Sequence, residues 1–272
     1  MWYDISMANN IKWRLVESPD VGKKTLTVYD GSNIHTINNS HINFDLILKK
    51  LQEGSDDIKN LLNVSEYVGD SFAKVTNKVS ISNGQVLYLG KALNSTLTKE
   101  IVEALREGSG NTKKLVKFLE SLMESASDIA RESLYDWIKA VRSFDHNAFQ
   151  INEDGSFIAY KACQEDEEGN IVSINAGPGI VNGKEQNGHL NNNVGNIVEM
   201  ARFKVTEDRS RACARGLHCG TLAYAKNFGL FGCHIVKVKV FPSDVVSVPN
   251  ESSAQKIRTC KYEVLEKVEN VW

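Results

Sequence analysis

The spacing of hydrophobic residues changes after Arg142, and this change limits the folds open to the chain. Before it, apolar residues recur about every 3.6 residues, which indicates helices over residues 95–107, 112–125 and 127–142. After it, polar and apolar residues alternate, as in the segment 156–163, and this is typical of strands. We therefore expect an α+β protein with a mainly helical N-terminal part, followed by a β-rich C-terminal domain.

Turn-forming residues predict two small hairpins within the N-terminal part. Asp30-Gly31 lies inside the apolar alternation of residues 25–37, and Asn83-Gly84 separates two apolar runs. Asn-Gly in that position is a strong hairpin signal. A helix from Phe44, capped by Ser40 or Asn43 and ended by Gly54, should follow the first hairpin, with a short helix over residues 56–67 after it.

The predicted organisation has three parts. They are an N-terminal extension at residues 1–24, with an alternative start at Met7, a helical domain with β-hairpins at 25–146, and a β-rich domain at 147–272. In the last part, residues 164–196 read as long loops around one short strand at 171–174. Further strands are expected at 197–205, 235–241, 245–248 and 262–268, with one short helix at 222–228.

Composition excludes some classes of protein. Five cysteines at irregular spacing favour free thiols in a reducing compartment. No apolar run approaches the roughly 20 residues of a transmembrane helix. The net charge is only -2, but residues 200–241 hold eight basic residues against Glu207 and Asp208. That stretch is either a solvated surface or a peripheral contact with a membrane or a nucleic acid.

The segment Cys213-Ala-Arg-Gly-Leu-His-Cys219 is the densest in reactive groups. Structural zinc sites usually space paired cysteines by two to four residues, whereas five residues separate this pair. Thiol catalysis would need an orienting group that the sequence does not identify, and the common phosphate-loop and hydrolase motifs are absent. The pattern favours a protein without catalytic activity, metal or cofactor, in which the cysteines pack as small hydrophobic residues.

Anion or nucleotide binding is a further interpretation of this segment. Arg215 and His218, with Tyr160 and Lys161 from a neighbouring strand, offer donors to a phosphate, and Gly216 allows a close approach of the backbone. A structural interpretation explains the same residues. In it, the glycine begins a strand and the histidine donates to a buried carbonyl group.

The chain resembles the rIIB proteins of T-even-type bacteriophages, the rapid-lysis proteins described as protectors from prophage-induced early lysis. The resemblance covers most of the chain. It is strongest in Cys213-Ala-Arg-Gly-Leu-His-Cys219, Val236-Lys-Val-Lys-Val240, Asp244-Val-Val-Ser-Val-Pro249 and Arg258-Thr-Cys-Lys-Tyr-Glu-Val264. The signature residues are Cys213, Cys219, Tyr224, Arg258 and Tyr262.

The resemblance implies a phage accessory protein in the cytoplasm of the infected cell or at its inner membrane. It also implies a companion rIIA-type protein, and no established catalytic activity. Two features differ from the family: no helix-turn-helix-like segment precedes Thr25, and the segment 176–200 is longer and richer in Asn and Gly.

Two hypotheses about function follow. The first is a protein that counteracts host or prophage exclusion and influences lysis timing through protein interactions, including self-association. The second is a domain that binds, or modifies, a nucleotide or another phosphate-containing signal of host defence.

Overall fold

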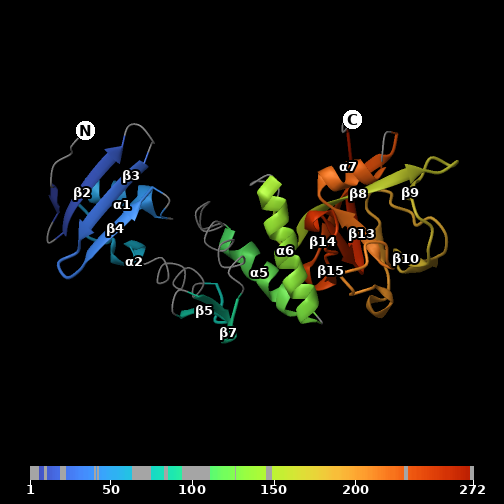
Figure 1. Cartoon of the computed structure of the whole chain (residues 1–272), viewed down its shortest axis with the longest axis horizontal. Helices are drawn as coiled ribbons and strands as arrows, with labels where there is room; N and C mark the ends of the chain where they lie inside the picture. The colour runs from blue at the N-terminus through green and yellow to red at the C-terminus, as the bar shows by residue number, and fades with distance from the viewer. Residues whose placement is uncertain are drawn as a thin grey trace. The chain divides into compact units, whose positions relative to one another are not determined.

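The chain forms two units, Met1–Thr112 and Lys113–Trp272. The computed structural model describes residues 6–8, 11–18, 23–39, 41, 43–62, 75–82, 85–93, 111–125, 127–144, 149–229 and 232–269. Figure 1 shows the first unit in blue to teal and the second in green to red.

The first unit begins with a four-stranded antiparallel sheet in the order β1-β2-β3-β4. Its inward-facing residues, among them Trp13, Leu26 and Val28, pack with two helices in one apolar core. Successive strand side chains point to opposite faces, so alternation puts the apolar ones on a single face. The elements are β1 (Ser6–Ala8), β2 (Ile11–Ser18), β3 (Lys23–Tyr29), β4 (Ile34–Asn38), α1 (Phe44–Gln52) and α2 (Lys59–Leu62).

A second, three-stranded antiparallel sheet completes the described part of this unit. It consists of β5 (Val79–Ser82), β6 (Gln85–Tyr88) and β7 (Lys91–Ala92). The prediction of a mainly helical N-terminal part is therefore wrong, because strands form most of the described elements here. The predicted Asn83-Gly84 turn and the helix at residues 95–107 lie outside the described residues.

The second unit contains a ten-stranded antiparallel sheet. Its strand order is β11-β10-β12-β17-β14-β8-β13-β16-β15, and β9 pairs with β8. The strands are β8 (Phe157–Glu165), β9 (Ile171–Ser173), β10 (Gly179–Val181), β11 (Lys184–Gln186), β12 (Ile197–Glu199), β13 (Leu217–Gly220), β14 (His234–Val240), β15 (Val245–Ser247), β16 (Lys256–Thr259) and β17 (Lys261–Val268).

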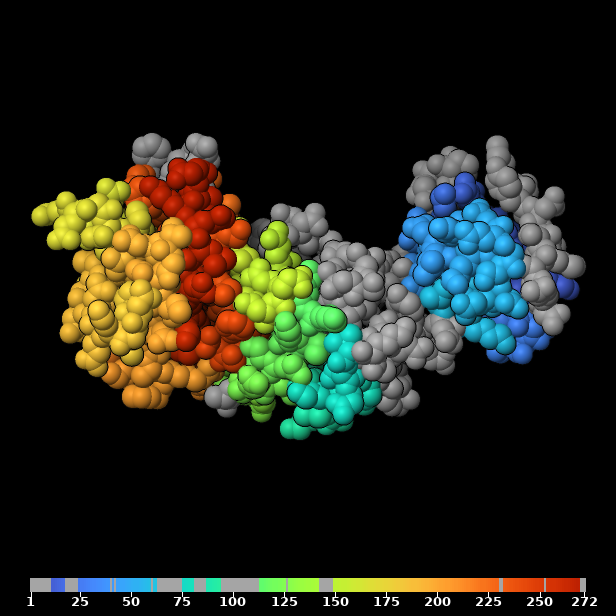
Figure 2. All heavy atoms as spheres, turned by 180° about the vertical axis from the view of Figure 1, so that it is seen from behind, coloured from blue at the N-terminus to red at the C-terminus, as the bar shows by residue number. Residues whose placement is uncertain are grey.

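Three helices pack on this sheet. The rings of α5 (Asn111–Met123) and α6 (Asp128–Phe144) form an aromatic cluster with Phe157 at the start of β8, in which the Trp137 and Phe157 centroids are 4.9 Å apart. Figure 2 shows the green surface of these helices beside the red surface of the C-terminal strands. The third helix, α7 (Leu222–Gly229), packs through Ala225 on Ala162 and Ile235.

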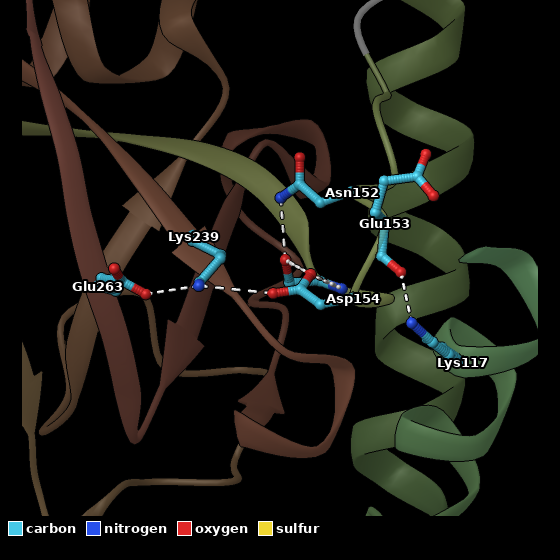
Figure 3. A network of polar contacts seen from close by, with 7 residues as sticks. Lys117, Asn152, Glu153, Asp154, Lys239 and Glu263 are labelled. Carbon is cyan, nitrogen blue, oxygen red and sulfur yellow. Dashed lines mark hydrogen bonds and ion pairs between the residues drawn. The ribbon is translucent and has the colours of Figure 1, made fainter. Parts of the chain in front are cut away.

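A polar network joins α5 to the sheet through the turn that precedes β8 (Figure 3). Lys117 of α5 donates from Nζ to the carbonyl oxygen of Glu153 at 2.9 Å. The carboxylate of the next residue, Asp154, lies 3.4 Å from Lys239 Nζ, which also pairs with Glu263 at 2.5 Å. The turn thus connects α5 with β14 and β17.

Parts of the C-terminal sheet differ from the sequence-based expectation. The segment 164–196 contains β10 and β11 besides the expected β9, and the strand expected at 197–205 ends at Glu199 and is followed by a 3-10 helix (Arg202–Lys204). Strand β13 begins directly after Gly216, as in the structural interpretation of that glycine, although no bounds were predicted for it. Strand β16 was not predicted, because it is short and buries the polar residues Lys256, Arg258 and Thr259. The strands near 235–241, 245–248 and 262–268 and the helix near 222–228 are confirmed.

Candidate anion-binding site

A cavity of about 300 Å³ lies between β8, β13, α7 and the segment 173–178. The five residues predicted to bind an anion all line it: Tyr160, Lys161, Arg215, Gly216 and His218. Antiparallel pairing of β8 with β13, in which Gly220 lies opposite Tyr160, brings these distant parts of the chain together. The juxtaposition that the sequence suggested is therefore present in the fold.

Lys161 is fixed at the cavity by its neighbours. Its Nζ donates to the carbonyl oxygen of His218 at 3.1 Å and lies 5.8 Å from the centre of the Tyr262 ring. The hydroxyl of Tyr262 in turn donates to Asn192 Oδ1 at 2.5 Å. An ammonium group has three donors, so the bond to His218 leaves Lys161 able to bind an anion as well.

Arg215 is exposed at the cavity, and its guanidinium makes no hydrogen bond or ion pair with another described residue. The main chain of Arg215 is held in place by a hydrogen bond that its carbonyl oxygen accepts from Thr206 N at 2.8 Å. A guanidinium presents planar, paired donors that match the oxygens of a phosphate. Arg215 is thus placed to contact a ligand.

The loop before Arg215 is anchored by two basic residues of β16. Arg258 is fully buried and donates to the carbonyl oxygens of Asp208 at 2.8 Å and Ala212 at 3.3 Å. Lys256 Nζ also donates to the Ala212 oxygen, at 2.7 Å. Burying a charge is costly unless it is hydrogen-bonded, and here main-chain oxygens accept from Nη1 and Nη2 of Arg258 and from Nζ of Lys256, whereas Arg258 Nε has no partner among the described residues. Burial lowers the pKa of both Lys256 and Arg258.

Gly216 has a structural requirement of its own. Its φ of +154° is disfavoured for residues with a side chain, and a Cβ there would lie 2.9 Å from Val205 Cγ1. The glycine therefore lets the chain pass Val205 as it turns from Arg215 into β13.

His218 is the least satisfied polar group at the cavity. Its Nε2 is buried and has no hydrogen-bond partner among the described residues. Burial, followed by the charges of Lys161 and Lys256, lowers the pKa of His218 to about 3. The imidazole is therefore neutral at neutral pH, and its Nε2 can donate or accept one hydrogen bond with a ligand, depending on the tautomer.

Aromatic rings of α7 also line the cavity. Tyr224 and Phe228 of α7 stack on each other with centroids 6.0 Å apart, and both line the cavity. Burial raises the pKa of Tyr224 to about 12, so its hydroxyl stays protonated. No aspartate or glutamate occurs among the described lining residues, whereas Lys161 and Arg215 are cationic. The cavity suits an anion that carries a planar apolar ring.

The cysteines do not supply a reactive thiolate to this cavity. Cys219 lines it but is buried, and burial raises the pKa of its thiol to about 12. Cys213 is exposed and lies outside the lining. In the described ranges, no group of three or more His, Cys, Asp or Glu side chains could hold a metal ion.

Residues 18–271 match the protein family described as Bacteriophage T4 protein rIIB. The chain belongs to the rIIB family. It is 32% identical over 255 residues to Protein rIIB of Enterobacteria phage T4, an alignment that covers 92% of this chain and 72% of the T4 protein. No solved structure matches this rIIB-family chain.

The signature residues of the rIIB resemblance divide into two groups in the structure. Cys219, Tyr224 and Tyr262 line the cavity, whereas Arg258 is buried behind it and Cys213 lies on the anchored loop. Three of the five signature residues therefore line this cavity.

The sequence interpretation missed other parts of the site. Lys256 is absent from the predicted site because β16 is short and is buried on both faces, so it gives no apolar-polar alternation. Phe228 belongs to the predicted short helix and to the residues of the family resemblance, and the segment 173–178 lies mainly in the predicted loops, but neither is predicted as part of a site. Over the described residues, no helix of this chain is long and apolar enough to span a bilayer.

Proposed function

We propose that the C-terminal unit binds a phosphate-containing nucleotide in the cavity between β8, β13 and α7. The observation that supports this best is the grouping of Lys161 and Arg215 with aromatic rings, in a lining whose described residues include no carboxylate. Phosphate oxygens would contact the two cations, and the base would lie against Tyr224 and Phe228.

The neutral His218 fits the same ligand. Its unpartnered Nε2 is able to hydrogen-bond a nucleobase or a ribose hydroxyl group. A neutral imidazole that hydrogen-bonds the ligand also has a much smaller desolvation cost than a charged imidazolium would have in a closed cavity. The site therefore combines charge recognition at Arg215 with hydrogen bonding deeper in the cavity.

The biological role that we propose rests on membership of the rIIB family. In this role the protein is a phage accessory factor in the cytoplasm of the infected host cell, where it counteracts host or prophage exclusion and influences lysis timing. It would act through protein contacts, with an rIIA-type protein as the first partner to test. Binding of a host nucleotide would then regulate those contacts.

Calorimetric titration of the full chain with AMP, ADP and GMP tests the binding step. We expect Arg215→Ala to weaken binding about tenfold, the typical effect of losing one charge-assisted hydrogen bond. Arg211→Ala is a matched control, because Arg211 is exposed on the same loop and does not line the cavity. Absence of binding by the unmodified chain, or equal losses in the two variants, would refute the proposed binding.

The role in infection needs a separate test. In a phage that encodes this chain, Arg215→Ala should alter lysis time or plating on prophage-carrying hosts, while Arg211→Ala should not. Co-purification from infected cells would show whether an rIIA-type partner is bound. A chain that remains without a partner in infected cells would count against a role through protein contacts.

A further inference from the structure

A second cavity adjoins the first one and shares part of its lining. It has a volume of about 370 Å³, and Pro178, Met200 and Arg215 line both cavities. Small-molecule sites have volumes from about 300 to 1,000 Å³, so each cavity is close to the lower limit and together they suit a ligand with two parts.

The second cavity offers chemistry similar to that of the first. Lys204 supplies a cation besides Arg215, and Ile180 and Met200 supply apolar surface. Asn187 and Glu185 also line it, and both can hydrogen-bond the polar edge of a nucleobase. Among the described lining residues, Glu185 is the one carboxylate, and it would hydrogen-bond the base while the phosphate would contact the cations.

Arg215 is the cation common to both cavities. Its guanidinium has no other hydrogen-bond or ion-pair partner in the described chain, so all its donors are available. A group bound by Arg215 would therefore sit between the two parts of a ligand. For a nucleotide ligand, that group is a phosphate joining two nucleosides.

Residues of the segment 176–200 form much of the lining of the second cavity. Pro178, Ile180 and Asn187 come from this segment, and β10 and β11 hold it in a hairpin paired with β12.

We propose that the two cavities together bind a dinucleotide, with its bridging phosphate on Arg215 and one nucleoside on each side. This proposal rests on the proposed nucleotide binding and narrows its ligand class. The nucleoside in the first cavity would lie near Tyr224 and His218, and the other near Met200 and Asn187. Lys204 would contact the ligand only on the second side.

Titration calorimetry on the full chain tests this, with AMP and GMP as mononucleotides and the linear dinucleotides pApA and pGpG, each with one bridging phosphate, as dinucleotides. We expect at least one dinucleotide to bind tenfold or more tightly than its mononucleotide. Lys204→Ala should weaken dinucleotide binding about tenfold and change mononucleotide binding less than twofold, since one charged contact is lost. Lys161→Ala should weaken both.

Lys184→Ala is the matched control for Lys204→Ala. Lys184 is an exposed lysine of β11 that lines neither cavity, and its replacement should change neither affinity. Mononucleotides that bind as tightly as dinucleotides, or a Lys204→Ala variant with unchanged dinucleotide binding, would overturn the two-part site and leave nucleotide binding intact. If no nucleotide binds at all, the proposed function itself fails.

Discussion

Gly155 gives a quantitative test of how helix α5 is attached to the sheet. Its φ is +85°, and a Cβ at this position would lie 2.5 Å from the carbonyl carbon of Lys117 in α5. Gly183 has a similar φ of +77° but no atom within 4 Å of its Cβ position. Alanine at Gly183 therefore measures the backbone cost alone, and alanine at Gly155 adds the contact with α5.

The expected magnitudes follow from these distances. A left-handed backbone costs an L-residue about 1–2 kcal/mol, and the stiffer unfolded chain offsets about 0.4–1 kcal/mol of it, so Gly183→Ala should lower the free energy of unfolding by about 1 kcal/mol. At Gly155 the Cβ must also move from 2.5 Å to an ordinary contact of 3.4 Å, a shift of about 0.9 Å. Such overpacking costs about 1–3 kcal/mol, and the bond from Lys117 to Glu153, worth about 1 kcal/mol, is lost with it. We expect about 3–5 kcal/mol for Gly155→Ala.

Urea unfolding measured by tryptophan fluorescence reports this difference. Trp137 is buried against Phe149 and Phe157 in the second unit, and replacing Trp13 with phenylalanine in every variant removes the buried tryptophan of the first. Destabilisation by Gly155→Ala that does not exceed that by Gly183→Ala would show that the turn does not pack on α5 as described.

Two further predictions concern pH and thiol chemistry. The pKa of His218 is about 3 in the folded protein instead of 6.5, so between these values the unfolded chain binds one proton more and stability is lost as the pH falls below 6.5. Burial raises the pKa of Asp244 from 3.8 to about 6, so the stability that its protonated form contributes is lost as the pH rises from 3.8 to 6. The free energy of unfolding of His218→Phe, relative to that of the unmodified chain, should therefore rise as the pH falls from 7 to 4, by up to about 1.4 kcal/mol per pH unit. For Asp244→Asn the same difference should rise as the pH increases from 4 to 7. Stability profiles that run parallel to that of the unmodified chain would contradict both assignments. Exposed Cys213 should react first with a thiol reagent in the folded protein, and Cys213→Ser should remove that fast phase, while Cys219, buried with a pKa of about 12, should react only on unfolding. A fast phase that persists in Cys213→Ser would contradict this order.

Local patterns in the sequence predicted the elements that depend on local interactions. The hairpin around Asp30, the helix from Phe44 and strand β14 are clear alternations or helical repeats, and the structure contains all three. The prediction was wrong about the proportion of helix and strand in the N-terminal part. The alternation of Ile11, Trp13 and Leu15 is typical of a strand, but the prediction places these residues in an N-terminal extension.

The remaining elements depend on long-range pairing that local patterns do not encode. In strand β16, Arg258 and Lys256 donate hydrogen bonds to carbonyl oxygens of a loop more than forty residues away in the sequence. The alternation of polar and apolar residues within a strand does not predict such distant partners. The same limit applies to the site. Arg215 and Lys161 were identified by their chemistry, but their meeting in one cavity depends on the pairing of β8 with β13.

A crystal structure of the full chain with AMP is the most direct test of nucleotide binding in the cavity. We predict phosphate oxygens at about 2.7–2.9 Å from the guanidinium of Arg215 and the Nζ of Lys161, the usual length of charge-assisted bonds. The base should lie against Tyr224, with His218 Nε2 within hydrogen-bonding distance of the ligand. A nucleotide bound away from this cavity, or a phosphate directed away from both cations, would contradict the proposed function.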